Sequence, residues 1–213
     1  MTQRHFLMAG AYRSECRQSD EPRFGLWVIN LLIMLIKSRG VGVADWALED
    51  DLMNGNAARD RRALVLRQRA RRHGWPWFHI GGNQDPRHAG EEAALRNRVS
   101  MPDVLLQPHS ASMEMTFYDG GQFPSEYRGD IFAAFHGSWN RSRRTGYKVV
   151  RVLLQNGQPT GEYEDFLTGF VISDKSVWAR PVGVAVAQDG SLLVSEDGNC
   201  SLWRVSYAGG TRS

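Results

Sequence analysis

The sequence predicts a mainly β fold, and three observations support this prediction. Short apolar runs alternate with turn residues from about residue 113 onward, and the runs have the length of strands. Their turns carry Gly, Asp and Asn, the residues that tight turns favour. Hydrophobic side chains make up 42% of the 213 residues, enough for a substantial core and too many for a disordered chain.

A first group of four strands is expected between residues 114 and 167. The apolar runs cover residues 114–118, 130–135, 147–154 and 163–167. Turn sequences separate them, among them Asp119-Gly120-Gly121 and Gln155-Asn156-Gly157. Four consecutive antiparallel strands of this length suit one blade of a β-propeller.

A second group of three strands is expected over residues 182–187, 191–196 and 201–207, separated by Asp-Gly turns. In a closed propeller, the N-terminal end of the chain often supplies the missing fourth strand of the last blade. A small β-sandwich has the same strand pattern and stays open as an alternative.

The first 72 residues do not share this pattern. Residues 57–72 are rich in strong helix formers and predict a helix, whereas residues 73–107 predict a long irregular loop with a short helical segment at 91–98. We expect residues 1–72 to be poorly ordered and to pack poorly against the β part. The apolar run at 26–36 is too short to span a membrane, and the first 20 residues show no secretory signal pattern.

Charge and cysteine content exclude few functions. Residues 59–72 contain seven arginines and one aspartate, a density that would suit phosphate contacts in nucleic-acid binding. No recognition motif accompanies them, so a solvated helix face is the favoured interpretation and no nucleic-acid partner is expected. The two cysteines, Cys16 and Cys200, predict neither a zinc site nor a disulfide framework.

An ordered set of motifs runs through residues 73–208. The set consists of Gly74-Trp75-Pro76-Trp77, Pro108-His109-Ser110, Phe135-His136-Gly137-Ser138-Trp139-Asn140-Arg141, Arg144-Thr145-Gly146-Tyr147-Lys148, Arg180-Pro181-Val182-Gly183 and Ser195-Glu196-Asp197. In this order, the motifs resemble the C-terminal part of the pyrroloquinoline-quinone-dependent sugar dehydrogenases of the glucose/sorbosone type.

The resemblance implies a partial six-bladed β-propeller. Residues 73–208 would form about two C-terminal blades, and residues 1–72 would be a partly helical segment outside the family. The implied function is a quinoprotein oxidoreductase that oxidises an aldose or a sorbosone-like aldehyde, with pyrroloquinoline quinone and calcium as cofactors. In the family, the catalytic histidine lies in earlier blades, so we expect a truncated chain whose catalytic residues are unknown. The family location is periplasmic.

The family cofactor is an ortho-quinone that carries several carboxylates, so its site needs cationic donors. The resemblance places a cofactor-contacting arginine at Arg180, for which a surface ion pair is the alternative. It also makes candidates of His136 and of Lys148, although a strand lysine is commonly a solvent-facing charge. The remaining candidates are His109, Ser110 and Asp197, with plain turn roles as the alternative. No metal ligand is assigned.

Five tryptophans could wall a sugar pocket or pack in the core, and packing is the favoured interpretation. They are Trp75, Trp77, Trp139, Trp178 and Trp203. A rival hypothesis for the whole chain is a non-catalytic propeller fragment or interaction module.

Overall fold

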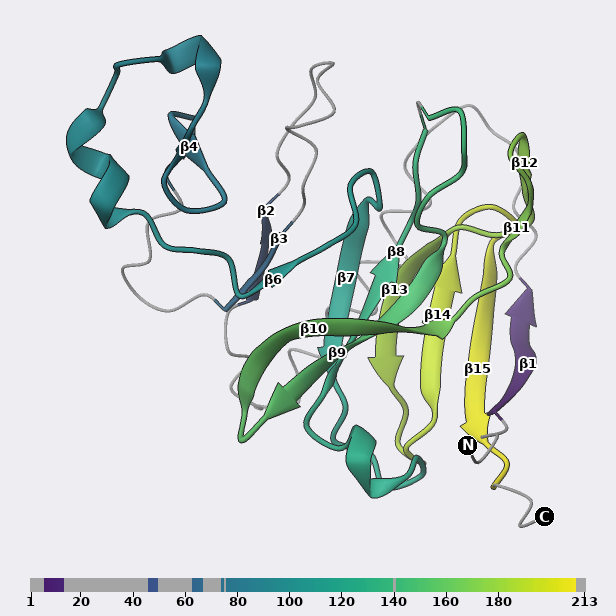
Figure 1. Ribbon diagram of the computed structural model, residues 1–213. Helices are drawn as coiled ribbons and strands as arrows, with labels where there is room; N and C mark the ends of the chain where they lie inside the picture. The colour runs from purple at the N-terminus through teal and green to yellow at the C-terminus, as the bar shows by residue number, and fades with distance from the viewer. Residues whose placement is uncertain are drawn as a thin grey trace.

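The computed structural model describes residues 6–13, 46–49, 63–66, 74, 76–139 and 141–209, with side chains from residue 74 onward. This part of the chain is mainly β (Figure 1). Its helical segments are three short 3-10 helices, η1 (Pro86–His88), η2 (Ala93–Arg98) and η3 (Ser125–Tyr127). The mainly β prediction is therefore confirmed.

The first large sheet contains four antiparallel strands in the order β10-β9-β8-β7. These are β7 (Ser112–Phe117), β8 (Ile131–Phe135), β9 (Lys148–Gln155) and β10 (Gln158–Leu167). Every strand pairs with its neighbour in sequence, as the turn signals predicted. β10 begins before residue 163 because its hairpin with β9 closes at the Gln158↔Gln155 pair.

The second large sheet also has four strands, in the order β1-β15-β14-β13. Three of them match the prediction: β13 (Pro181–Val186), β14 (Leu192–Glu196) and β15 (Ser201–Tyr207). The fourth, β1 (Phe6–Arg13), pairs antiparallel with β15 from Phe6↔Tyr207 to Arg13↔Ser201. The expectation of a three-stranded second sheet was therefore wrong, because β1 adds a strand. For residues 6–13, the expectation of poor packing against the β part was wrong as well, since these residues pair with β15.

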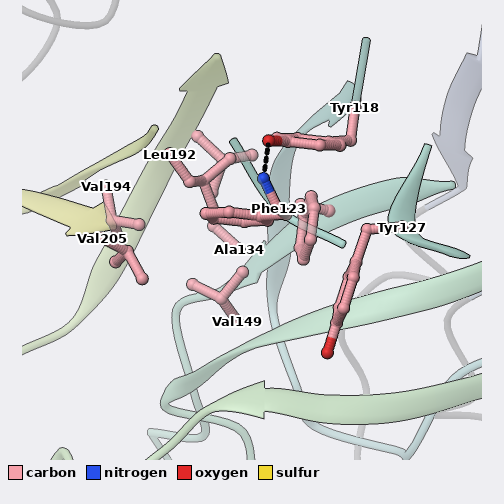
Figure 2. Close-up of a cluster of buried hydrophobic side chains, with 10 residues drawn as sticks. Tyr118, Phe123, Tyr127, Ala134, Val149, Leu192, Val194 and Val205 are labelled. Atoms are coloured by element: carbon pink, nitrogen blue, oxygen red, sulfur yellow. Dashed lines mark hydrogen bonds between the residues drawn. The ribbon is translucent and has the colours of Figure 1, made fainter. Parts of the chain in front are cut away.

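The two sheets share a core. β13 of the second sheet contacts β7 and β8 of the first, and buried side chains from both sheets form one cluster (Figure 2). Tyr118 lies in this cluster, where its hydroxyl donates to the Gly190 carbonyl at 2.7 Å and accepts from the Phe123 N–H at 2.8 Å. The cluster fixes β7 and β13 relative to each other, and with them the loops at their ends.

The remaining strands are short. β2 (Trp46–Glu49), β3 (Ala63–Leu66) and β6 (Val104–Leu105) form a three-stranded sheet, and β4 (Phe78–His79) pairs with β5 (Asn83–Gln84). The helix prediction for 57–72 is wrong at β3, where pairing with β2 and β6 outweighs local helix propensity. The rest of that segment and the apolar run at 26–36 lie outside the described residues.

Two further findings bear on the sequence predictions. In the described part of the chain, no helix is long and apolar enough to cross a membrane. Cys200 is disulfide-bonded, whereas the two cysteines had predicted no disulfide framework.

Candidate functional site

His136 lies directly after the last residue of β8, where the chain leaves the first sheet. Its N–H donates to the carbonyl of Ala111 at 2.9 Å, and the N–H of Gly137 donates to the carbonyl of Ser110 at 2.9 Å. These bonds extend the β7–β8 pairing by two residues. They fix the backbone of His136 at the end of the sheet and place the 109–111 turn beside it.

Tyr147 packs against the residue that follows His136. Gly137 has a φ of +104°, and a Cβ at this position would lie 2.4 Å from atoms of the Tyr147 ring. The Tyr147 hydroxyl donates to the carbonyl of Ser138. Only glycine combines this backbone angle with this close approach, so the Gly137–Tyr147 contact depends on glycine.

Arg180 and Asp197 come together through the pairing of β13 with β14. Arg180 immediately precedes β13, Asp197 immediately follows β14, and the Asp197 N–H donates to the Arg180 carbonyl at 3.3 Å. The Nε of Arg180 lies 2.8 Å from the Oδ1 of Asp197. Asp197 therefore does more than form a turn.

His136 of the first sheet reaches the same carboxylate. Its Nε2 lies 3.1 Å from both Oδ1 and Oδ2 of Asp197. Partial burial raises the pKa of Asp197, but the hydrogen bond from His136 and the charges of His136 and Arg180 outweigh it and hold the pKa below its ordinary value. We call His136, Arg180 and Asp197 the Asp197 cluster.

The Asp197 cluster is open to solvent. The side chains of His136, Arg180 and Asp197 are 25%, 42% and 39% exposed. The Nε of Arg180 is the atom that contacts Asp197. The two Nη nitrogens of Arg180 make no hydrogen bond with any other described residue. A guanidinium in this position can bind an incoming carboxylate through both Nη groups.

Glu196 holds the backbone on which Arg180 and Asp197 lie, and the sequence analysis did not select this residue. This buried carboxylate accepts from the N–H groups of Arg180, Asn199 and Ser201 at 3.4, 3.0 and 3.0 Å. It thus fixes the start of β13 and the turn that carries Asp197. An acidic residue at the end of a strand, immediately before an Asp-Gly turn, was the available signal.

Three sequence candidates take other positions. Lys148 pairs with Asp165 of β10 at 2.5 Å, and no hydrogen bond or ion pair between described side chains joins it to the Asp197 cluster. Ser110 is buried and donates to the Gln107 carbonyl at 2.7 Å, a turn-stabilising contact. His109 adopts a φ of +63° in the same turn.

The tryptophans divide between packing and exposure. Trp178 contacts Phe170 and Trp203 through its ring, and Trp77 donates from Nε1 to Glu91 at 3.2 Å. Trp139 is 77% exposed. Trp75 lies outside the described residues. The packing interpretation is confirmed for Trp178 and Trp203, whereas Trp139 is not a core residue.

The described residues contain no group of three or more His, Cys, Asp or Glu side chains that could hold a metal ion. What they do contain is a histidine and an arginine on one shared carboxylate, at the ends of two four-stranded antiparallel sheets. These features define a mainly β protein in which two sheets bring a histidine, an arginine and an aspartate together at their strand ends.

Within this class, the chain belongs to the TrAA12-like family, whose model matches residues 68–208. Among curated proteins, it is 35% identical over 136 residues to an uncharacterized protein of Borreliella burgdorferi, covering 63% of this chain and 35% of that protein. It is 30% identical over 142 residues to the pyrroloquinoline quinone-dependent pyranose dehydrogenase of Coprinopsis cinerea, covering 57% of this chain and 18% of that enzyme.

The fold is similar to that of a solved member of carbohydrate-active enzyme family AA12 from Trichoderma reesei. The TM-score is 0.57 at 22% identity, over 76% of this chain and 49% of that one. The chain thus spans about a third or less of the curated relatives' length and about half of the solved one.

Proposed function

We propose that this chain is the C-terminal part of a quinoprotein that oxidises a sugar with pyrroloquinoline quinone. Membership of the TrAA12-like family and similarity to a pyranose dehydrogenase that depends on this cofactor support the proposal. The observation that carries it is the Asp197 cluster, in which one carboxylate binds both His136 and Arg180. The substrate would be an aldose or a sorbosone-like aldehyde.

The residues of the cluster fit the cofactor. Pyrroloquinoline quinone carries several carboxylates beside its ortho-quinone, and the Nη groups of Arg180 suit a carboxylate. The His136 imidazole can donate a hydrogen bond to a second oxygen of the cofactor. When bound, the quinone would accept two electrons from the sugar. Asp197 would orient Arg180 and His136.

The other sequence candidates have smaller roles in this proposal. The 109–111 turn, with His109 and Ser110, would form a wall of the site, since its carbonyls hold the backbone of His136 and Gly137. Lys148 could join the site only by leaving Asp165. Calcium has no fit among the described residues, so we give it no role here.

The proposal includes an incomplete site. A cofactor clamped at the centre of a propeller needs donors from several blades, and the family places the catalytic histidine in an earlier one. We therefore propose that residues 73–208 form two C-terminal blades, that the residues before the family match at 68 lie outside the family pattern, and that the complete enzyme is periplasmic. The chain alone should bind the quinone weakly and oxidise sugars at the background rate.

The experiment is a calorimetric titration of the purified chain with pyrroloquinoline quinone, followed by a dye-linked assay on glucose and sorbosone. Weak binding that Arg180→Ala reduces about tenfold would support the proposal. Arg204→Ala is the matched control, because Arg204 is equally exposed at 42% and also pairs with an exposed aspartate, Asp189. Equal binding by the two variants would exclude Arg180 from the site.

A second candidate is a non-catalytic propeller fragment or interaction module. The same experiment separates the two. A module would leave the quinone unbound at any concentration, whereas turnover far above that of Arg180→Ala would identify an enzyme that is active without further blades.

A further inference from the structure

Exposed apolar side chains gather on two connected loops of the described part of the chain. Of its five large hydrophobic side chains that are exposed, Trp139 (77%), Ile172 (66%) and Val171 (39%) lie on these loops. The other two are Met101 and Met113. Single exposed apolar residues are common on protein surfaces, but a group of three requires an explanation.

The two loops are held together. The first spans residues 138–145 between β8 and β9, and the second is the hairpin of β11 (Val171–Ser173) and β12 (Ser176–Val177). Ser138 and Thr145 close the first loop, since the Ser138 N–H donates to the Thr145 carbonyl at 2.8 Å. The Nη2 of Arg144 donates to the Lys175 carbonyl at 3.3 Å, which joins the loop to the hairpin. Both lie at the same end of the molecule (Figure 1).

Basic residues flank the apolar ones. Arg141, Arg143 and Lys175 are exposed, with Asp174 as the one acidic residue of the two loops. Neither Arg141 nor Arg143 forms an ion pair with another described residue. The pair of loops therefore presents apolar side chains beside net positive charge.

We propose that these loops dock on an anionic lipid surface. Tryptophan favours the interface between headgroups and acyl chains, because its ring is largely apolar but carries a polar N–H group. Isoleucine and valine on the hairpin joined to its loop can enter the acyl boundary, while arginine and lysine attract anionic headgroups. The lipid-docking surface comprises Trp139, Val171, Ile172, Arg141, Arg143 and Lys175.

Lipid explains this composition better than nucleic acid does. Single-stranded nucleic acids stack on aromatic rings, and Val171 and Ile172 offer none. An acidic protein would satisfy the charges, and the experiment below excludes or supports it. The inference does not depend on the quinone, so the proposed function and the lipid-docking surface can fail separately.

The test is cosedimentation of the chain with vesicles of phosphatidylcholine alone or with 30% phosphatidylglycerol, at low and high salt. We expect at least about tenfold tighter binding to the anionic vesicles at low salt, with the difference lost at high salt. Trp139→Ala combined with Ile172→Ala should weaken binding about tenfold, and Arg141→Ala with Arg143→Ala should remove the preference for anionic vesicles. Met101→Ala and Arg128→Ala, exposed residues elsewhere, are the matched controls.

A second measurement identifies the residue that enters the lipid. Brominated phosphatidylcholine mixed with phosphatidylglycerol should quench part of the tryptophan fluorescence of the chain. Trp139→Phe should still bind but lose this quenching. Equal binding of the chain to neutral and anionic vesicles, or quenching that survives in Trp139→Phe, would overturn the proposal. No binding to either vesicle would also overturn it and would favour an acidic protein as the partner.

Discussion

The Nε of Arg180 lies 2.8 Å from the Oδ1 of Asp197, and both side chains are partly exposed. An ion pair with this much solvent contact contributes between zero and about 1 kcal/mol to the free energy of unfolding. Stability alone therefore does not explain the arrangement, in which Asp197 also binds His136 from the other sheet. In the proposed function, Asp197 would orient these two donors toward a carboxylate of the cofactor.

The first prediction concerns the shape of the Arg180 side chain. Arg180→Lys should change the free energy of unfolding by less than about 1 kcal/mol. It should lower the affinity for pyrroloquinoline quinone about tenfold, because an ammonium cannot contact Asp197 and a cofactor carboxylate with a planar fork. Urea denaturation and calorimetry measure the two effects. Unchanged affinity would show that only charge matters at this position, and Arg204→Lys serves as the control.

Gly137 should be intolerant of a side chain. Gly137→Ala places a Cβ 2.4 Å from the Tyr147 ring at a φ of +104°, so we expect a loss of about 2 kcal/mol or more in unfolding free energy. Gly129→Ala is the matched control, since Gly129 has a φ of +92° and no atom within 4 Å of the new Cβ. The control should lose about 1 kcal/mol. Thermal or urea unfolding that gives equal losses would contradict the contact.

The buried guanidinium of Arg151 in the first sheet is paired with the buried carboxylate of Asp130. The Nε of Arg151 donates to the Oδ2 of Asp130 at 2.6 Å, and the two side chains are 9% and 5% exposed. Asp130→Ala would leave this buried cation short of a partner, and we expect it to cost about 3 kcal/mol in urea unfolding. Glu164 also binds Arg151 but is 51% exposed, so Glu164→Ala should cost under about 1 kcal/mol. A larger loss of unfolding free energy in Glu164→Ala than in Asp130→Ala would be inconsistent with the burial of the Arg151–Asp130 pair.

Glu114 of β7 should make stability depend on pH. Burial raises its pKa to about 7, although an N–H of Val184 donates to it and acts in the opposite direction. Because the unfolded chain ionises nearer pH 4.5, the stabilisation is present below that pH and is lost as the pH rises toward 7. After allowance for partial exposure, we expect a loss on the order of 1–2 kcal/mol.

Glu114→Gln tests this pH dependence. The variant should lack the decrease between pH 4.5 and 8, whereas Glu162→Gln, at an exposed position, should retain it. Urea unfolding at several pH values gives the slopes. Parallel curves for the wild type and Glu114→Gln would show that another group causes the dependence.

The sequence predicted the strands that local chemistry defines. Turns such as Gln155-Asn156-Gly157 separate β9 from β10 within a few residues, so the pattern is readable without a structure. β1 escaped detection because it pairs with β15 at the other end of the chain. β1 is a strand because it pairs with β15, and a short stretch of sequence around residues 6–13 gives no information about that pairing. The same reason explains β3, where a predicted helix became a strand.

The candidate site was predictable in its parts and not in its arrangement. The family motifs selected His136, Arg180 and Asp197, but His136 and Asp197 are 61 residues apart and come from different sheets. Only the packing of β7 and β8 against β13 brings them together. Lys148 was selected by the same motifs but is not part of the cluster. Its ion pair with Asp165 on the neighbouring strand could not be predicted from the motif.

The most direct test of the Asp197 cluster is to map the binding of pyrroloquinoline quinone on the isotope-labelled chain by amide NMR, which detects weak complexes. The largest shifts should occur at the amides of His136, Arg180 and Asp197. Arg180→Ala should reduce these shifts, and Arg204→Ala should leave them unchanged. Shifts that concentrate away from these three residues, or that persist in Arg180→Ala, would contradict a quinone site at the Asp197 cluster.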